Sequence, residues 1–137
     1  MENSFTSEVS INKISYYLPT SYENVYDFEK HNPDWSIDNV IKKTGITKVF
    51  IAEEDETSVD LAVKAIDLFF EKFEIDRMCV EGLLFVTQSP DYALPTSACI
   101  IQEKTELSKT ILGFDINLGC SGFVNSLGVA VGLIKSS

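Results

Sequence analysis

The sequence has 137 residues, of which 45% are hydrophobic and 23% are charged, as in ordinary folded domains. Its formal net charge of −10 argues against a basic surface for nucleic acid, so that class of partner is excluded. The same charge would repel anionic membranes and acidic proteins.

Strands and helices are predicted to alternate along the first half of the chain. Alternating apolar residues over 9–18 indicate a strand with one irregularity. Residues 23–31 indicate a short polar helix, and residues 35–43 indicate a second helix that ends at Gly45. Residues 48–51 are predicted to form a short strand, because they are rich in β-forming side chains.

The second half continues the alternation. A helix capped by Thr57 or Ser58 is expected to run to Phe73, because apolar residues recur there at helical spacing. The other elements expected are strands over 82–87 and 111–116 and helices over 95–106 and 121–135. This order predicts an α/β domain with a mostly parallel (mixed) sheet and helices on both faces.

One stretch, residues 116–134, carries no charge over 19 residues, which is close to the length of a membrane span. It contains Asn117, Ser121, Asn125 and Ser126, so its hydrophobicity is well short of a Leu-rich span. We interpret it as a helix buried on every side within a protein, and we expect no membrane association.

The chain has three cysteines, an odd number without C-x-x-C spacing. This pattern argues against a disulfide framework and against a zinc site, and it fits a reducing cytoplasm. We therefore expect a cytoplasmic protein without a bound metal. The polar N-terminus is unlike a secretory signal.

Cys120 has the setting of a nucleophile. A buried strand leads into a turn in which Gly119 and Gly122 flank Cys120, and a helix then begins. A cysteine at a helix N-terminus faces unpaired N–H groups and the positive end of the dipole, and both favour the thiolate. The same N–H groups could stabilise an oxyanion.

A purely structural interpretation of Cys120 stays open, because free cysteines are commonly buried as small apolar residues. Core packing is the default for Cys99, and Cys79 is also interpreted as structural. A nucleophilic cysteine usually works with a histidine. The single histidine, His31, lies in a polar segment and is interpreted as a surface residue. Either a partner of Cys120 lies outside these residues, or there is no catalysis.

Four stretches together resemble the β-ketoacyl-acyl carrier protein synthase III family of condensing enzymes. They are the Trp35 region with Thr44-Gly45-Ile46, Glu56-Thr57 with its helix, Val86–Gln102, and Phe114–Phe123 around Cys120. The resemblance begins at about Val9 and implies the N-terminal half, over residues 1–137, of a thiolase-like fold with the C-terminal half absent. It also implies a homodimer.

The resemblance implies an acyltransferase of fatty acid biosynthesis, or of related acyl chains. Cys120 would be acylated by acyl-coenzyme A, the substrate, with no permanently bound cofactor. Malonyl-acyl carrier protein would then decarboxylate and attack the thioester. The histidine and asparagine that assist in the family belong to the second half, so residues 1–137 alone are not expected to complete condensation.

Three substrate-binding residues are carried over from the family. Trp35 resembles the tryptophan that stacks on the coenzyme A adenine, although partial burial against the domain explains it equally well. Lys43 occupies the place of a coenzyme-binding arginine. Leu94 resembles the residue that reaches across the dimer into the partner's acyl pocket.

Other functions stay open. A thiolase or a hydroxymethylglutaryl-type synthase shares the nucleophilic cysteine, and a specialised ketosynthase-like acyltransferase would suit the acidic balance. A third possibility is a non-catalytic half-domain or one subunit of a split pair, with a role in binding.

Overall fold

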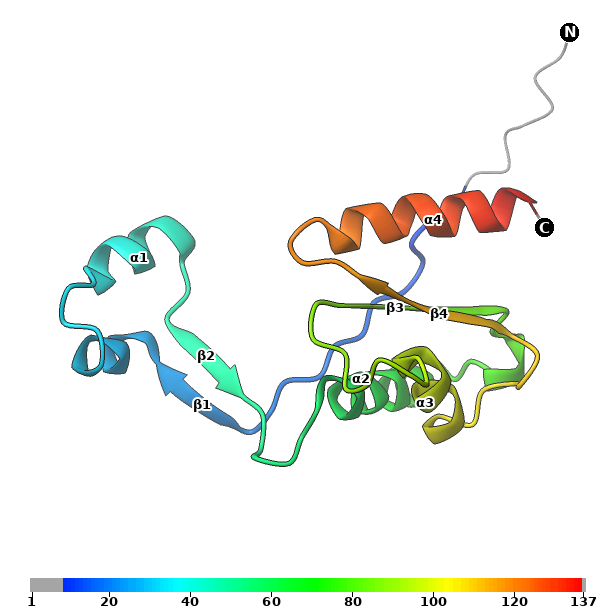
Figure 1. The fold of residues 1–137 in the computed structure, drawn as a ribbon, viewed down its shortest axis with the longest axis horizontal. Helices are drawn as coiled ribbons and strands as arrows, with labels where there is room; N and C mark the ends of the chain where they lie inside the picture. Colours follow the sequence, from blue (N-terminus) through cyan, green and yellow to red (C-terminus); the bar gives the residue numbers. More distant parts are fainter. Residues whose placement is uncertain (1–8, 137) are drawn as a thin grey trace, which may run out of the picture. The chain divides into compact units, whose positions relative to one another are not determined.

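The computed structural model describes residues 9–136, which divide into two compact units. The smaller unit is Leu18–Thr57, and the larger combines the residues up to Tyr17 with those from Ser58 onward. Each unit has its own two-stranded sheet. Figure 1 gives the course of the chain within each unit.

The smaller unit contains β1 (Ser21–Asn24), the 3-10 helix η1 (Val25–Lys30), α1 (Ile37–Thr44) and β2 (Lys48–Ile51). β1 and β2 pair antiparallel, with Ser21 opposite Ile51 and Asn24 opposite Lys48. Val25 and Ile37 are its buried apolar side chains among the described residues. Gly45 ends α1 at a φ of 73°, a left-handed conformation that favours glycine, and its N–H donates to the Ile41 carbonyl at 2.8 Å.

The larger unit contains α2 (Ser58–Phe73), the 3-10 helix η2 (Arg77–Cys79), β3 (Gly82–Thr87), α3 (Ser97–Lys104), β4 (Leu112–Asn117) and α4 (Gly122–Ser136). β3 and β4 pair in parallel from Gly82 opposite Leu112 to Thr87 opposite Asn117. α4 covers one face of this sheet, whereas α3 covers the other with α2 beside it (Figure 1). Helices therefore lie on both faces, as predicted.

Most predicted elements are confirmed, with boundaries that differ by a few residues at α1, α3 and α4. The strand predicted over 9–18 is wrong: those residues form no strand. The helix predicted over 23–31 is wrong at its start, because Ser21–Asn24 form β1 and the following helix is of the 3-10 type. Local alternation detects a pattern suited to a sheet, but a strand also needs a partner for its backbone groups.

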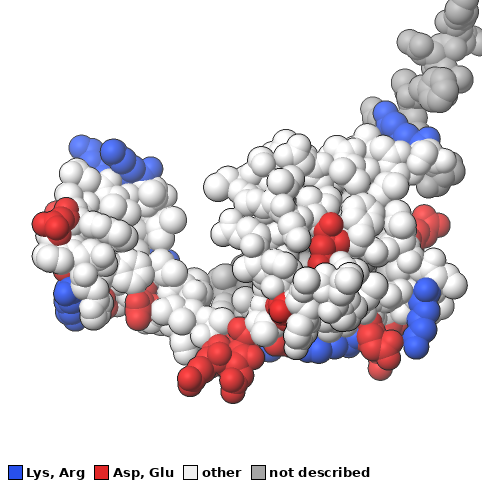
Figure 2. Space-filling model, viewed as in Figure 1, with Lys and Arg blue, Asp and Glu red and all other residues white. Residues whose placement is uncertain are grey.

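α4 is buried on one side only in this chain, which corrects the prediction of burial on every side. Of its side chains, Ser126 is buried, whereas Phe123, Val124 and Ile134 are more than half exposed. In Figure 2 the surface over α4 is nearly free of charge except at its C-terminal end. The helix thus presents an uncharged, largely apolar face outward.

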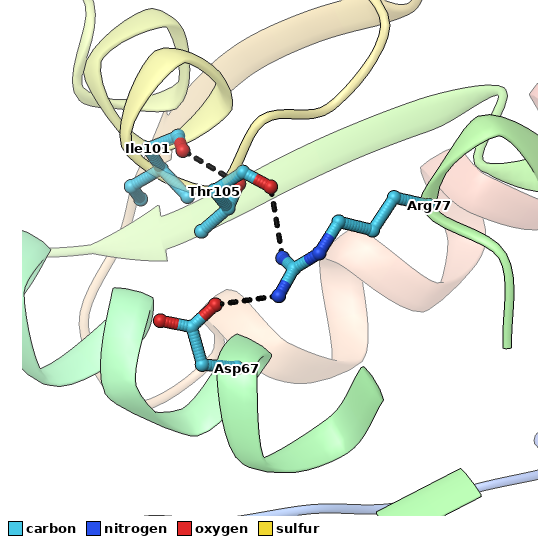
Figure 3. A network of polar contacts seen from close by, with 4 residues as sticks. All are labelled: Asp67, Arg77, Ile101 and Thr105. Carbon is cyan, nitrogen blue, oxygen red and sulfur yellow. Dashed lines mark hydrogen bonds and ion pairs between the residues drawn. The ribbon is translucent and has the colours of Figure 1, made fainter. Parts of the chain in front are cut away.

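Arg77 links α2 to the C-terminal end of α3 (Figure 3). Its guanidinium donates to the carbonyl of Thr105 at 2.8 Å and to the Asp67 carboxylate at 2.9 Å. The guanidinium carbon also lies 4.5 Å from the centre of the Phe70 ring. A cation is stabilising beside the last carbonyls of a helix, so Arg77 serves as a C-terminal cap supplied by another element.

Replacing Arg77 with alanine is expected to lower the free energy of unfolding by about 1 kcal/mol, chiefly through the lost bond to the part-buried Thr105 carbonyl. The Asp67 carboxylate is about half exposed, so Asp67→Asn should change stability by less than about 0.5 kcal/mol. Urea unfolding of both variants measures the difference. Equal effects of the two substitutions would contradict the capping role.

Candidate active site

Cys120 lies in the turn between the end of β4 and the start of α4. Within the turn the N–H of Gly122 donates to the Gly119 carbonyl at 2.8 Å. The Ser121 carbonyl accepts from the backbone N–H of Asn125 at 3.1 Å and from its side-chain amide at 3.0 Å. The Cys120 thiol is free and exposed. The predicted strand–turn–helix setting is therefore present, and the thiol is open to a reagent.

Both glycines of the turn pack closely against β3 or the residue that follows it. A Cβ on Gly119 would lie 2.8 Å from Oε1 of Gln88, and a Cβ on Gly122 would lie 2.7 Å from Cγ1 of Val86. Distances below 3.0 Å force a neighbour to move. Glycine is thus needed at position 122, where the neighbour is the β-branched Val86, a reason that the sequence did not reveal. At position 119 the neighbour is the end of the flexible Gln88 side chain, which could move aside.

Asp115 on β4 caps α3 from the adjacent element. Its two carboxylate oxygens accept from the backbone N–H groups of Ser97 and Ala98, at 2.7 and 2.8 Å. The N-cap residue Thr96 makes no capping bond with its own side chain to the helix backbone. Partial burial raises the pKa of Asp115, but hydrogen bonds from Ala98 and Thr96 outweigh it, so the pKa lies below its usual value.

The loops that follow β3 and β4 leave the same edge of the sheet, because the strands are parallel and end together. In parallel sheets, ligands commonly bind at this carboxyl edge. The loop after β3 carries Leu94, which is 84% exposed, and the loop after β4 carries Cys120. The Ser58 hydroxyl lies within hydrogen-bond distance of the Ser89 carbonyl and the Asp91 carboxylate and so anchors the first loop to α2.

Trp35 and Lys43 belong to the smaller unit. Trp35 precedes α1, and its side chain is 54% exposed. Its backbone N–H donates to the Asn32 carbonyl at 3.0 Å. Lys43 is exposed in the last turn of α1. The structure thus places these two residues on one unit and Leu94 and Cys120 on the other. Their substrate-binding roles stay predictions.

The other two cysteines are exposed too. Cys99 is exposed on α3, so the expectation of core packing is wrong, and Cys79 is exposed in η2. His31 is exposed at the end of η1, as its polar surroundings indicated. Within residues 9–136 no cluster of three or more His, Cys, Asp or Glu side chains could hold a metal. No described helix has the length and apolarity to cross a membrane.

Sequence reasoning missed Gln88, Val86 and Asp115. Gln88 and Val86 contact the turn that carries Cys120 only because β3 pairs with β4, and no local sequence pattern predicts such contacts. Asp115 could have been predicted, because it is an acid in the otherwise apolar strand 111–116 and an acid that is partly buried needs hydrogen-bond partners.

No family model matches the chain. Among curated proteins it is similar to β-ketoacyl-[acyl-carrier-protein] synthase III of Sulfurovum sp., with 36% identity over 93% of this chain and 37% of that protein. The corresponding protein of Clostridium beijerinckii is 33% identical over 95% of this chain and 39% of its own length. The chain thus spans little more than a third of these relatives.

Solved structures with a similar fold are also 3-oxoacyl-(acyl-carrier-protein) synthases III. A crystal structure of 3-oxoacyl-(acyl-carrier-protein) synthase III matches with a TM-score of 0.79 and 36% identity, over 88% of this chain and 36% of that one. The enzyme of the same name from Aquifex aeolicus matches with a TM-score of 0.75 and 31% identity, over 89% and 39%. The predicted α/β, thiolase-like fold is confirmed, whereas the assignment of residues 1–137 to an N-terminal half stays a prediction.

Proposed function

The chain belongs to the β-ketoacyl-[acyl-carrier-protein] synthase III family, and we propose that Cys120 is its acyl acceptor in decarboxylative condensation. The observation that supports this most is the position of Cys120. Its free, exposed thiol lies at the carboxyl edge of a parallel strand pair and directly before a helix of 15 residues. Both features suit attack on a bound thioester.

The first step is transfer of an acyl group from acyl-coenzyme A to Cys120. The thiolate attacks the thioester carbonyl carbon, and the bond from that carbon to the coenzyme A sulfur breaks. Coenzyme A leaves as a thiolate and takes up a proton. N–H groups at the start of α4 stabilise the intermediate oxyanion. Coenzyme A is a substrate in this scheme, and no permanently bound cofactor takes part.

The second step joins the acyl group to a malonyl unit on acyl carrier protein. Malonyl-carrier protein loses carbon dioxide, and the resulting carbanion attacks the Cys120 thioester. A carbon–carbon bond forms, the carbon–sulfur bond breaks, and the Cys120 thiolate is regenerated. In the family a histidine and an asparagine of the second half would assist, and the single histidine of this chain, His31, is exposed at the end of η1.

The remaining assignments are part of the same proposal. The half-exposed indole of Trp35 stacks on the adenine of coenzyme A, and Lys43 pairs with its phosphates. Leu94, the most exposed of the large apolar residues described, enters the acyl pocket of a partner subunit in a homodimer. Three unpaired cysteines fit a reducing cytoplasm. The pathway is fatty acid synthesis or a related acyl-chain synthesis.

Incubation with a panel of acyl-coenzyme A thioesters, read by intact mass, tests the loading step. The chain is expected to gain one acyl group, and Cys120→Ala is expected to abolish that gain. Because Cys79 and Cys99 are also exposed, Cys79→Ala and Cys99→Ala are the matched controls and should still be loaded.

Loading that persists in Cys120→Ala would refute the assignment of the acceptor. Absence of loading in the unmodified chain, repeated with the full-length reading frame, would favour a binding role instead. The acyl group that loads fastest would also identify the preferred primer.

A further inference from the structure

We infer that Gln88 is a positioning residue for the Cys120 turn, an inference that rests on the proposed function. The amide oxygen of Gln88 lies against Gly119, the residue next to Cys120, at 2.8 Å from the place of a Cβ. Gln88 itself follows the last residue of β3 and is exposed. Its side chain thus contacts the turn that carries Cys120 from the bend after the adjacent strand.

Leu84 and Val86 lie on one face of β3, because alternate residues of an extended chain point to the same side. Gln88, in the bend that follows the strand, completes a row with them through its contact with Gly119. Contacts with α4 and its turn confirm this orientation. Leu84 lines a groove of about 440 Å³ together with Leu133 and Ile134 of α4. The row therefore follows α4, from Leu84 near the C-terminal end of the helix to Val86 at its start.

The row holds the turn at both ends. Val86 touches Gly122, where α4 begins, and Gln88 touches Gly119, where the turn leaves β4. Cys120 lies between these two contacts. The Val86 contact fixes the start of the helix, so removal of the Gln88 contact loosens chiefly the other end of the turn, which keeps the hydrogen bond from the Gly122 N–H to the Gly119 carbonyl.

The two contacts differ in chemistry. Val86 has a short, β-branched side chain with few rotamers, whereas Gln88 ends in a polar group on a flexible stem. The Gln88 amide oxygen lies on the side of Gly119 where a Cβ would stand. Gln88 can thus set the turn without being part of the packed core, which makes it separable from stability.

The inference is tested in the full 137-residue chain with Gln88→Ala, with Gln88→Glu as the conservative variant that retains the oxygen. Tyr92→Ala, an exposed side chain in the same loop, is the matched control. The first measurement is amide hydrogen exchange over residues 119–122. Gln88→Ala should speed it at least about threefold while exchange in the second half of α4 is unchanged, and Gln88→Glu should restore it.

The second measurement compares acylation of Cys120 by acyl-coenzyme A with its alkylation by iodoacetamide. Acyl transfer needs an aligned thiolate, so Gln88→Ala should slow it about tenfold. Alkylation needs only an accessible thiol and should not slow. A merely structural role would leave the ratio of the two rates at its original value.

The two measurements together test the role of Gln88. Unchanged exchange in the turn, or faster exchange with an unchanged acylation rate, overturns the role of Gln88. Faster exchange in the turn supports the contact. If neither the unmodified chain nor the full-length reading frame is acylated, the contact stands but the proposed acceptor role of Cys120 is contradicted. Slower acylation in Tyr92→Ala as well would show that the loop in general, and not Gln88, is responsible.

Discussion

Gly122→Ala is expected to lower the free energy of unfolding by about 2–3 kcal/mol. The new Cβ would lie 2.7 Å from Cγ1 of Val86 and 3.2 Å from Cβ of Leu118. Val86 is held in β3 and cannot rotate freely, so either the strand or the start of α4 must shift. Chemical unfolding followed by circular dichroism measures the loss.

Gly128→Ala is the matched control, since it adds the same methyl group to the same helix with nothing within 4 Å of it. Alanine has the higher helix propensity, so this variant should gain up to about 1 kcal/mol. Gly122→Ala combined with Val86→Ala should recover part of the loss. Equal stabilities of the two single variants would mean that α4 does not approach β3 as closely as the structure shows.

The elements of the larger unit were predictable because each has a clear pattern of apolar residues. Gly82–Thr87 is a continuous apolar run, which suits a parallel strand covered on both faces, and Ser58–Phe73 has apolar residues at helical spacing. The alternation over 9–18 carries the same kind of signal without a pairing partner, and it gave a wrong strand. Pattern thus predicts conformation well only where tertiary partners exist.

The sequence predicted the cysteine of the candidate site but not the residues that pack against its turn. Cys120 was found because a glycine-flanked cysteine between a strand and a helix has local chemical meaning. Val86 and Gln88 are separated from it by more than 30 residues in the sequence and meet the turn only through the parallel register of β3 and β4. Contacts of that kind follow from register and side-chain alternation, which a single sequence does not specify.

The second large effect is expected at Asp115. Asp115→Asn should lower the free energy of unfolding by about 2 kcal/mol at neutral pH, because one carboxylate serves two backbone N–H groups at the start of α3. An amide has a single oxygen, so one N–H would lose its acceptor or face the amide's own donors. Partial exposure of Asp115 keeps the estimate below the sum of two charged hydrogen bonds.

The pH dependence has a definite sign. The pKa of Asp115 is lower in the folded chain than its usual value, so the folded state binds fewer protons than the unfolded state. The stabilisation is complete above the usual pKa, and it is lost as the pH falls through the lower pKa of the folded state. Asp115→Asn should therefore remove part of the acid sensitivity as well as part of the stability.

Glu103→Gln is the matched control, because it removes a carboxylate from the same helix where the side chain is largely exposed and its ion pair with Lys109 is long, at 3.5 Å. Its stability should change by less than about 0.5 kcal/mol at any pH. The decisive comparison is the stability of both variants and the unmodified chain from neutral to acid pH. If the curve for Asp115→Asn ran parallel to that of the unmodified chain, the cap would owe its strength to shape and not to charge.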